Sequence, residues 1–302
     1  MRYNLIAVIG PTAAGKTFLG ASLAHKFNGE IISADSRQVY RGMDIGTGKD
    51  LSDYVIDGNK IPYHLIDVID PREEFNLFVF NKLFYEAFDE INSRSKIPFL
   101  VGGTGLYLQS IFKNYSLNSV EFNKERFSEL DTLDKQELVE ILMKSNPALH
   151  NTTDLLVKER IIRAIMIAEK NADNSNGAKI NINPLVIGVQ LERDVIKKRI
   201  TARLKSRLDN GMVEEVKKMK EEGITSERLE LFGLEYKFLS KYLDGELNYN
   251  DMYQKLNSSI HAFAKRQMTW FRKMEKEGVE IHWIDGANYA QAEKIINHKY
   301  FQ

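Results

Sequence analysis

The sequence predicts an α/β fold, in which a parallel sheet core is interrupted by a mostly helical insertion. Two observations indicate this fold. In the first third of the chain, apolar runs of strand length alternate with helical patterns, as in a parallel sheet covered by helices. From about residue 113 to residue 183 no segment has the pattern of a strand, and strand character returns at residue 184. We therefore place the core at 1–115 and 184–302, and the insertion at 116–183.

The elements expected in the first third follow from local periodicity. Residues 78–93 are an example, because their apolar side chains recur at the spacing of a helix. HLIDVID, residues 64–70, is a possible third strand. In order, the predicted elements are a strand at 5–9, a helix at 16–27, strands at 30–33 and 64–70, a helix at 78–93, and a strand from 97 that enters a glycine turn at 102–105.

The rest of the chain is richer in helices. In the insertion we expect two helices, at 125–144 and 155–170, followed by a polar joint at 171–183. The core resumes with an apolar strand, PLVIGVQL, and GVEIHWID has the character of a last strand. Long helices are predicted between these strands, at 194–209, 212–222 and 250–276.

Composition limits the class of protein. A chain of 302 residues with 43% hydrophobic residues can bury a sizeable core. It has no run of roughly eighteen apolar residues, so we expect no membrane span. It has no cysteine, which excludes disulfides and cysteine-ligated zinc and fits a cytoplasmic location. The formal net charge of zero counts against a nucleic-acid partner unless basic residues cluster locally.

The segment GPTAAGKT predicts a phosphate-binding loop in a P-loop NTPase-like core. It matches the pattern G-x-x-x-x-G-K-[ST], and it lies between an apolar strand and a helix, as that motif requires. Backbone N–H groups would bind phosphate oxygens, Lys16 would add a positive charge, and Thr17 would offer a hydroxyl to Mg²⁺. The motif does not identify the phosphate ester. The candidate residues are Gly10, Pro11, Thr12, Ala13, Ala14, Gly15, Lys16 and Thr17.

Asp35 lies where the second strand reaches the carboxyl edge of the sheet, the edge at which ligands bind in such folds. Three interpretations of this acid are open. It could cap a short helical turn, hold a magnesium ion, or act as a general base on a nucleophile that approaches a bound phosphate ester. GGTG, residues 102–105, lies at another strand end, where glycines would let the backbone approach a ligand closely. A plain strand-to-helix turn is the alternative there.

Two basic segments are candidates for binding anions or RNA. In RDVIKKRITARLKSR, residues 193–207, Arg199 and Arg203 lie four apart on one helix face, from which a guanidinium could reach a diphosphate. The alternative is a solvated charged face. In AKRQMTWFRK, residues 264–273, basic and aromatic residues interleave. That pattern suits RNA contact, but also a helix that packs its aromatic side chains inward.

Together, and in this order, these motifs resemble those of bacterial tRNA dimethylallyltransferases, also called tRNA isopentenyltransferases, of the IPP transferase family. The matching stretches span nearly the whole chain. ISADSRQVYRGMDIGTGK is the most specific of them, because P-loop kinases lack it. The other matching stretches are GPTAAGKT, HLIDVIDP, PFLVGGTGLYL, ERIIRAI, RITARL with GMVEEVKKM, and AKRQMTWFRK.

The resemblance implies a prenyl transfer. A dimethylallyl group would move from dimethylallyl diphosphate to N6 of adenosine 37 in tRNA, and diphosphate would leave. By match to the family, Asp35 would be the general base, and Thr12 and Arg203 would contact the diphosphate. The P-loop would then hold a diphosphate rather than ATP, with Mg²⁺ held partly by Thr17.

The implied partners are dimethylallyl diphosphate and tRNA, bound through its anticodon stem-loop. The helical insertion would clasp this stem-loop, and we expect a monomer with no membrane contact. The residues that match tRNA-contacting positions of the family are Asp35, Ser36, Arg37, Gln38, Thr104, Glu159, Arg160, Ile161, Ile162 and Arg163.

Three segments depart from the family pattern. They are LHNTTDLL at 149–156, residues 168–183, and ELFGLEYKF at 230–238, where the family usually has a Gln-Ala-x-Gly-Tyr-Lys-like stretch. All three lie where RNA would be held, whereas the donor-side motifs are intact. The resemblance therefore supports transfer of an isoprenoid better than it supports the identity of the acceptor.

Three alternatives come from other classes of function. A P-loop small-molecule kinase would use Asp35 to activate a hydroxyl, but the segment RQVYRGMDIGTGK counts against it. An adenylate isopentenyltransferase would prenylate a free nucleotide, whereas the long insertion and AKRQMTWFRK favour RNA. A nucleotide-dependent RNA-binding module would need no general base.

Overall fold

The computed structural model describes residues 3–115, 124–145, 158–171 and 181–301. Contacts divide the chain into two units, one formed by Met1–Asn114 with Ile182–Gln302 and the other by Tyr115–Asn181. The sequence predicts these boundaries after residue 115 and before residue 184. In the described ranges, none of the helices combines the length and the apolar character that crossing a bilayer requires.

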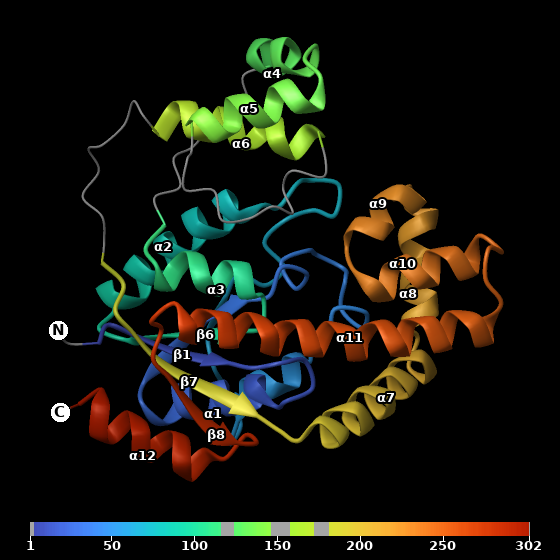
Figure 1. Cartoon of the computed structure of the whole chain (residues 1–302). Helices are drawn as coiled ribbons and strands as arrows, with labels where there is room; N and C mark the ends of the chain where they lie inside the picture. The colour runs from blue at the N-terminus through green and yellow to red at the C-terminus, as the bar shows by residue number, and fades with distance from the viewer. Residues whose placement is uncertain (1–2, 116–123, 146–157, 172–180, 302) are drawn as a thin grey trace. The chain divides into compact units, whose positions relative to one another are not determined.

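A parallel sheet forms the centre of the first unit (Figure 1). In the described residues its strand order is β5-β2-β6-β1-β7-β8, and every neighbouring pair is parallel. The carboxyl ends of β1, β2 and β6 therefore meet at one edge, where folds of this type bind ligands. The strands are β1 (Leu5–Ile9), β2 (Gly29–Ala34), β5 (Tyr63–His64), β6 (Ile97–Gly102), β7 (Pro184–Gln190) and β8 (Ile281–Asp285).

Helices cover both faces of the sheet, because the central strand is apolar on both sides. Leu5, Ala7 and Ile9 belong to the apolar cluster of one face, while Ile6 and Val8 belong to that of the other. The first face is covered by α2 (Leu77–Ser93), α3 (Gly105–Phe112) and α11 (Tyr249–Lys276), and the second by α1 (Lys16–Lys26) and α12 (Tyr289–Lys299) (Figure 1).

A second group of helices packs against α11 around its own apolar cluster. The group comprises α7 (Arg193–Asp209), α8 (Met212–Glu221), α9 (Ser226–Leu231) and α10 (Leu234–Leu243). Val39, Tyr40 and Met43 from the segment after β2 join this cluster, so the helices anchor that segment. We did not predict α9, α10 or α12. Side-chain caps at Thr225 and Asn288, which start α9 and α12, were the available signals.

The third predicted strand is corrected by the structure. HLIDVID does not continue as a strand, because β5 ends at His64 and the next residues include Leu65 and Asp67 with φ of 62° and 55°. The segment before β5 contains a 3₁₀ turn at Leu51–Tyr54 and a hairpin of β3 (Val55–Ile56) and β4 (Asn59–Lys60). A two-residue Asp-Gly turn, a common hairpin signal, joins these two strands.

The second unit contains α4 (Lys124–Asp131), α5 (Lys135–Ser145) and α6 (Lys158–Asn171) in its described residues. The single helix predicted at 125–144 is wrong. Asp134 accepts the N–H groups of Gln136 and Glu137 at 2.8 and 2.9 Å, a cap that begins a new helix. The helix expected at 155–170 corresponds to α6, with residues 155–157 outside the described range. The apolar core comprises Leu130, Leu138, Leu142, Ile161, Ile162, Ile165 and Met166.

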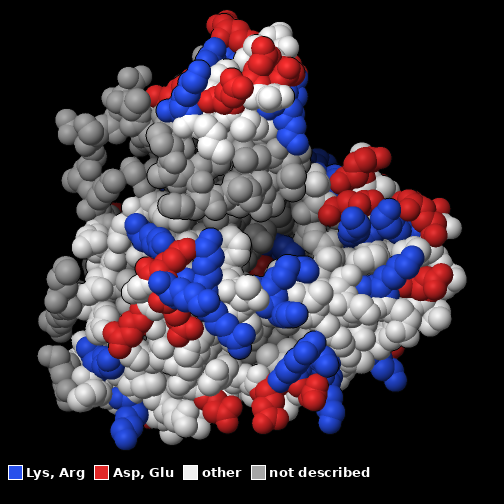
Figure 2. Space-filling view, in the orientation of Figure 1, with Lys and Arg blue, Asp and Glu red and all other residues white. Residues whose placement is uncertain are grey.

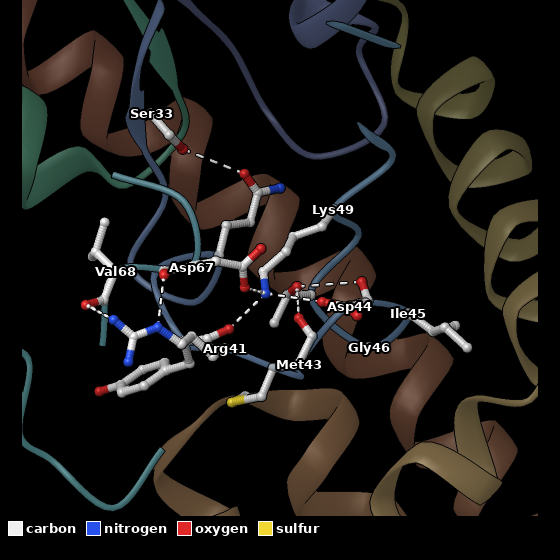
Figure 3. Close-up of polar contacts among 12 residues, drawn as sticks. Ser33, Arg41, Met43, Asp44, Ile45, Gly46, Lys49, Asp67 and Val68 are labelled. Carbon is white, nitrogen blue, oxygen red and sulfur yellow. Dashed lines mark hydrogen bonds and ion pairs between the residues drawn. The ribbon is translucent and has the colours of Figure 1, made fainter. Parts of the chain in front are cut away.

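A buried lysine holds the segment that follows Asp35 (Figure 3). The ammonium of Lys49 donates to the backbone C=O of Tyr40 at 2.5 Å and to Asp44 at 3.0 Å, and it also contacts Asp67. Its side chain is fully buried. Most of the DSRQVYRGMDIGTGK motif therefore has a structural role. The carboxylates of Asp44 and Asp67 contribute to it by binding Lys49.

Glu215 on α8 also binds the segment that follows Asp35. Its carboxylate accepts the N–H groups of Asp44, Ile45 and Gly46 at 2.8, 2.7 and 2.9 Å. It also accepts the hydroxyl of the buried Tyr236 at 2.7 Å. A charged acceptor with this many donors contributes more than an ordinary hydrogen bond.

We expect Glu215→Ala to lower the free energy of unfolding by about 2–4 kcal/mol, because three N–H groups and a buried phenol lose their acceptor. Urea denaturation would measure the change. Glu214→Ala, at an exposed position on the same helix, is the control and should change stability by less than about 0.5 kcal/mol. Equal effects of the two substitutions would contradict the role of Glu215.

Candidate active site

Residues 10–15 form a tight loop between β1 and α1, and Lys16 and Thr17 are the first residues of that helix. Ala13 and Gly15 have left-handed backbone conformations, with φ of 64° and 88°, and α1 begins directly after Gly15. Such a loop turns successive N–H groups to one side, which is the arrangement that binds phosphate. Within the loop, Gly10, Pro11 and Ala14 are buried. The loop residues that line the adjacent pocket are Thr12, Ala13, Gly15, Lys16 and Thr17.

This pocket collects charges from distant parts of the sequence. Arg203 joins it from α7, whereas Arg199 on the same helix is exposed to solvent. Asp35 enters from the end of β2. The charged residues that line the pocket are Lys16, Arg37, Arg203 and Arg207 on the basic side, and Asp35, Asp50, Asp53 and Glu235 on the acidic side.

Burial makes two of these cations less stable in their charged form. The pKa of Lys16 is lowered to about 8, mainly by burial; Asp35 opposes this shift, and Arg203 and Arg37 add to it. The pKa of Arg203 is lowered to about 10, first by burial and then by the charge of Arg207. A bound anion would offset both effects, so the pocket favours a negatively charged ligand.

Thr12 is held by two long helices at once. The guanidinium of Arg203 on α7 donates to the Thr12 hydroxyl. The side-chain oxygen of Gln267 on α11 accepts the Thr12 N–H at 2.8 Å, and the amide nitrogen of Gln267 donates to the C=O of Gly103 at 2.8 Å. Gln267 is only 7% exposed. One buried amide therefore joins the P-loop to the GGTG segment.

The glycines of GGTG let segments of the protein itself approach one another. A Cβ at Gly103 would lie 2.5 Å from the amide nitrogen of Gln267 and 2.9 Å from the C=O of Gly10. The hydroxyl of Thr104 accepts the N–H of Ser36 at 3.1 Å, which ties the end of β6 to the Asp35 segment. The P-loop, GGTG and the Asp35 segment thus form one connected edge.

Asp35 has both a structural contact and access to the pocket. Its Oδ1 accepts the N–H of Arg37 at 2.9 Å, so it caps the turn that follows β2. Its carboxylate also lines the pocket beside Lys16 and Thr17. Gln38 completes the segment by donating to the C=O of Gly48 at 3.0 Å. Asp35 therefore lies at the pocket while one of its oxygens is bound by the backbone of its own segment.

The remaining predicted tRNA-contacting residues, Glu159 to Arg163, lie on α6 of the second unit. Ile161 and Ile162 are fully buried in the core of that unit. The side chains of Glu159, Arg160 and Arg163 lie outside the described part of the chain.

Sequence reasoning did not identify Gln267, Glu235 or Arg207 as site residues. A signal existed for Gln267, which occupies a position in the buried stripe of α11 between Ala264 and Phe271. In the segment AKRQMTWFRK, Phe271 is buried, while the basic side chains Lys265, Arg266, Arg272 and Lys273 are exposed. The segment packs inward and also presents cations outward.

Comparisons with known proteins identify the family. A model described as IPP transferase matches residues 38–274. The chain is 51% identical over 301 residues to tRNA dimethylallyltransferase 1 of Geotalea daltonii. The aligned residues cover 99% of this chain and 97% of that protein. The chain belongs to the IPP transferase family. A further relative, tRNA dimethylallyltransferase 2 of Syntrophotalea carbinolica, is 53% identical over 289 residues, or 95% of this chain and 96% of that one.

Solved structures agree with the assignment to the IPP transferase family. The full-length tRNA isopentenylpyrophosphate transferase from Bacillus halodurans superposes with a TM-score of 0.70 at 33% identity, covering 99% of this chain and 95% of that one. A eukaryotic dimethylallyltransferase acting on tRNA has a TM-score of 0.78 at 24% identity, covering 98% and 77%, which supports the fold alone. The parallel sheet core is therefore the core of this family.

We expect Gln267→Leu to lower the free energy of unfolding by about 1–3 kcal/mol, because the Thr12 N–H and the Gly103 C=O both lose their partner. Chemical denaturation would measure the change. Gln254→Leu makes the same exchange at an exposed position of α11 and should have little effect. Equal stability of the two variants would contradict the bridging role of Gln267.

Proposed function

We propose that this protein transfers a dimethylallyl group from dimethylallyl diphosphate to N6 of adenosine 37 in tRNA, releasing diphosphate. The observation that carries the proposal is that one pocket brings the P-loop, Arg203 and Asp35 together. The curated relatives named tRNA dimethylallyltransferase support it, because they match this chain over nearly its whole length. Action on tRNA also makes the cytoplasm the proposed location.

The proposed reaction divides the pocket into a base side and a diphosphate side. The exocyclic amine of adenine is a weak nucleophile, so a base that takes its proton as the N–C bond forms would accelerate transfer. Asp35 is the proposed base. As the allylic C–O bond breaks, its electron pair leaves with the diphosphate. Lys16, Arg203 and the N–H groups of the P-loop would stabilise that charge.

A magnesium ion would fit beside the P-loop. Mg²⁺ usually keeps several waters and binds one or two protein oxygens together with phosphate oxygens. The Thr17 hydroxyl lines the pocket, and the described residues contain no group of three or more His, Asp or Glu that could hold a metal. We therefore propose Thr17 and the diphosphate as the ligands. A bound ion would neutralise part of the diphosphate charge.

Exposed cations on α11 would provide contacts for RNA in a chain with no net charge. Lys265, Arg266, Arg272 and Lys273 are exposed on this helix. Figure 2 shows basic side chains gathered over the middle of one face of the first unit, with acidic side chains among them. Adenine 37 belongs to a single-stranded loop, so turning it out of the stack costs less than in a duplex.

The direct test incubates the protein with magnesium, labelled dimethylallyl diphosphate and unmodified tRNA, with AMP and ADP replacing tRNA in a parallel reaction. We expect label in tRNA, mapped to adenosine 37 by nuclease digestion. Label in the free nucleotide would instead assign the protein to the adenylate-prenylating class. Absence of label from both acceptors would refute the proposed function.

Asp35→Asn should reduce turnover by about 100-fold or more while tRNA binding is retained, because the amide cannot take the proton. Single-turnover transfer and a tRNA binding assay would separate the two effects. Asp57→Asn, in the exposed hairpin turn, is the matched control and should keep full turnover. Unchanged turnover of Asp35→Asn would remove Asp35 as the base.

The KM for dimethylallyl diphosphate should rise by about tenfold between pH 7 and pH 9, because Lys16 is charged below its pKa of about 8 and neutral above it. The phosphate groups of the donor are already ionised in this range, since a terminal phosphate has its second pKa at about 6. In Lys16→Arg the rise should largely disappear, because a guanidinium stays charged. The same rise in both proteins would show that Lys16 does not cause it.

A further inference from the structure

Glu235 is a buried acid at the start of α10. It is 4% exposed and lies in the first turn of this helix, where the N-terminal partial charge favours a carboxylate. Its Oε2 accepts a hydrogen bond from Nη1 of Arg37 at 2.8 Å. Burying a charge is costly unless it is paired and hydrogen-bonded, so this contact stabilises both side chains.

Arg37 is confined on several sides. Its guanidinium lies over the ring of Phe263 on α11, 5.5 Å from the ring centroid. Gly233, which precedes α10 with a φ of 125°, leaves room for the arginine, because a Cβ there would lie 2.8 Å from Cδ of Arg37. The Nε of Arg37 is 3.8 Å from Oδ1 of Asp35, too far for a hydrogen bond.

Arg37 therefore meets two carboxylates and is hydrogen-bonded through its side chain to Glu235. A guanidinium binds a carboxylate best through two parallel hydrogen bonds. If Glu235 did not hold Nη1, Asp35, whose Oδ1 already lies 3.8 Å from Nε, would be the carboxylate left to bind the guanidinium. The oxygens of Asp35 would then be occupied and unable to accept the adenine N–H.

We propose that Glu235 is a positioning residue that keeps the guanidinium of Arg37 away from Asp35 and so leaves the base free for its substrate. This inference rests on the proposed function, in which Asp35 is the base. It gives the ELFGLEYKF segment, which departs from the family pattern, a role in the reaction through Arg37.

The test compares Glu235→Gln with the wild-type protein in the labelled transfer assay at saturating tRNA. We expect kcat to fall about tenfold or more, while the KM for dimethylallyl diphosphate stays within about threefold, because the P-loop is untouched. Glu230→Gln is the matched control. It removes one acid from the neighbouring α9, where Glu230 pairs with Lys237 and Lys241 at 3.2 Å, and it should keep the wild-type kcat.

The double variant Arg37→Gln/Glu235→Gln distinguishes positioning from mere stabilisation. With no guanidinium to occupy Asp35, it should recover most of the kcat that Glu235→Gln loses, and it removes both partners of the buried Arg37–Glu235 pair together. A double variant no more active than the single one would overturn the proposal, as would wild-type kcat in Glu235→Gln.

Thermal unfolding would show whether the variants are folded. If Glu235→Gln does not fold, the folded double variant decides. A kcat within about tenfold of the wild type supports the proposal, and any larger loss overturns it. Failure of both variants to fold would assign the pair to stability and overturn it too. No transfer by the wild-type protein would instead refute the proposed function itself.

Discussion

The site depends on the buried amide of Gln267, which accepts the N–H of Thr12 and donates to the C=O of Gly103. Leaving both backbone groups without a partner would cost about 1–3 kcal/mol. The amide thereby fixes the distance between the P-loop and the end of β6. Thr104 extends the connection to the Asp35 segment through the N–H of Ser36. The P-loop, the end of β6 and the Asp35 segment are positioned by one continuous set of hydrogen bonds.

The charges of the pocket fit the proposed binding of a diphosphate. Lys16 and Arg203 have lowered pKa values because they are largely buried, and a protein gains no stability from cations in such positions. Their arrangement is useful when a polyanion binds, since charges that are already fixed need no reorganisation as the leaving group gains charge. The acidic side chains around these cations reduce the repulsion between their positive charges. Glu235 pairs with Arg37 and Asp50 pairs with Arg207 at 2.8 and 3.4 Å.

Local sequence information was sufficient for five of the six strands of the sheet and for the loop between β1 and α1. Apolar runs placed β1, β2, β6, β7 and β8, and the P-loop motif needs only its own residues. The same information was insufficient at residues 125–144, where a cap at Asp134 interrupts an otherwise helical pattern. It also failed at Leu65, where a positive φ ends β5.

The site residues that were missed act through contacts between distant parts of the chain. Gln267 is 255 residues from Thr12, and Glu235 is 198 residues from Arg37. No periodicity or spacing rule connects such positions. A polar residue in an apolar stripe, as at Gln267, indicates only that some buried partner exists. The partner is defined by the fold, because parallel strands bring their carboxyl ends to one edge.

The most direct test of this account is a structure of the protein with an unreactive analogue of dimethylallyl diphosphate and an anticodon stem-loop. We predict that the diphosphate contacts residues 12–17 and Arg203, and that N6 of adenosine 37 lies about 2.6–3.2 Å from the carboxylate of Asp35. Binding of the diphosphate outside the P-loop, or an adenine whose N6 is directed away from Asp35, would contradict the account.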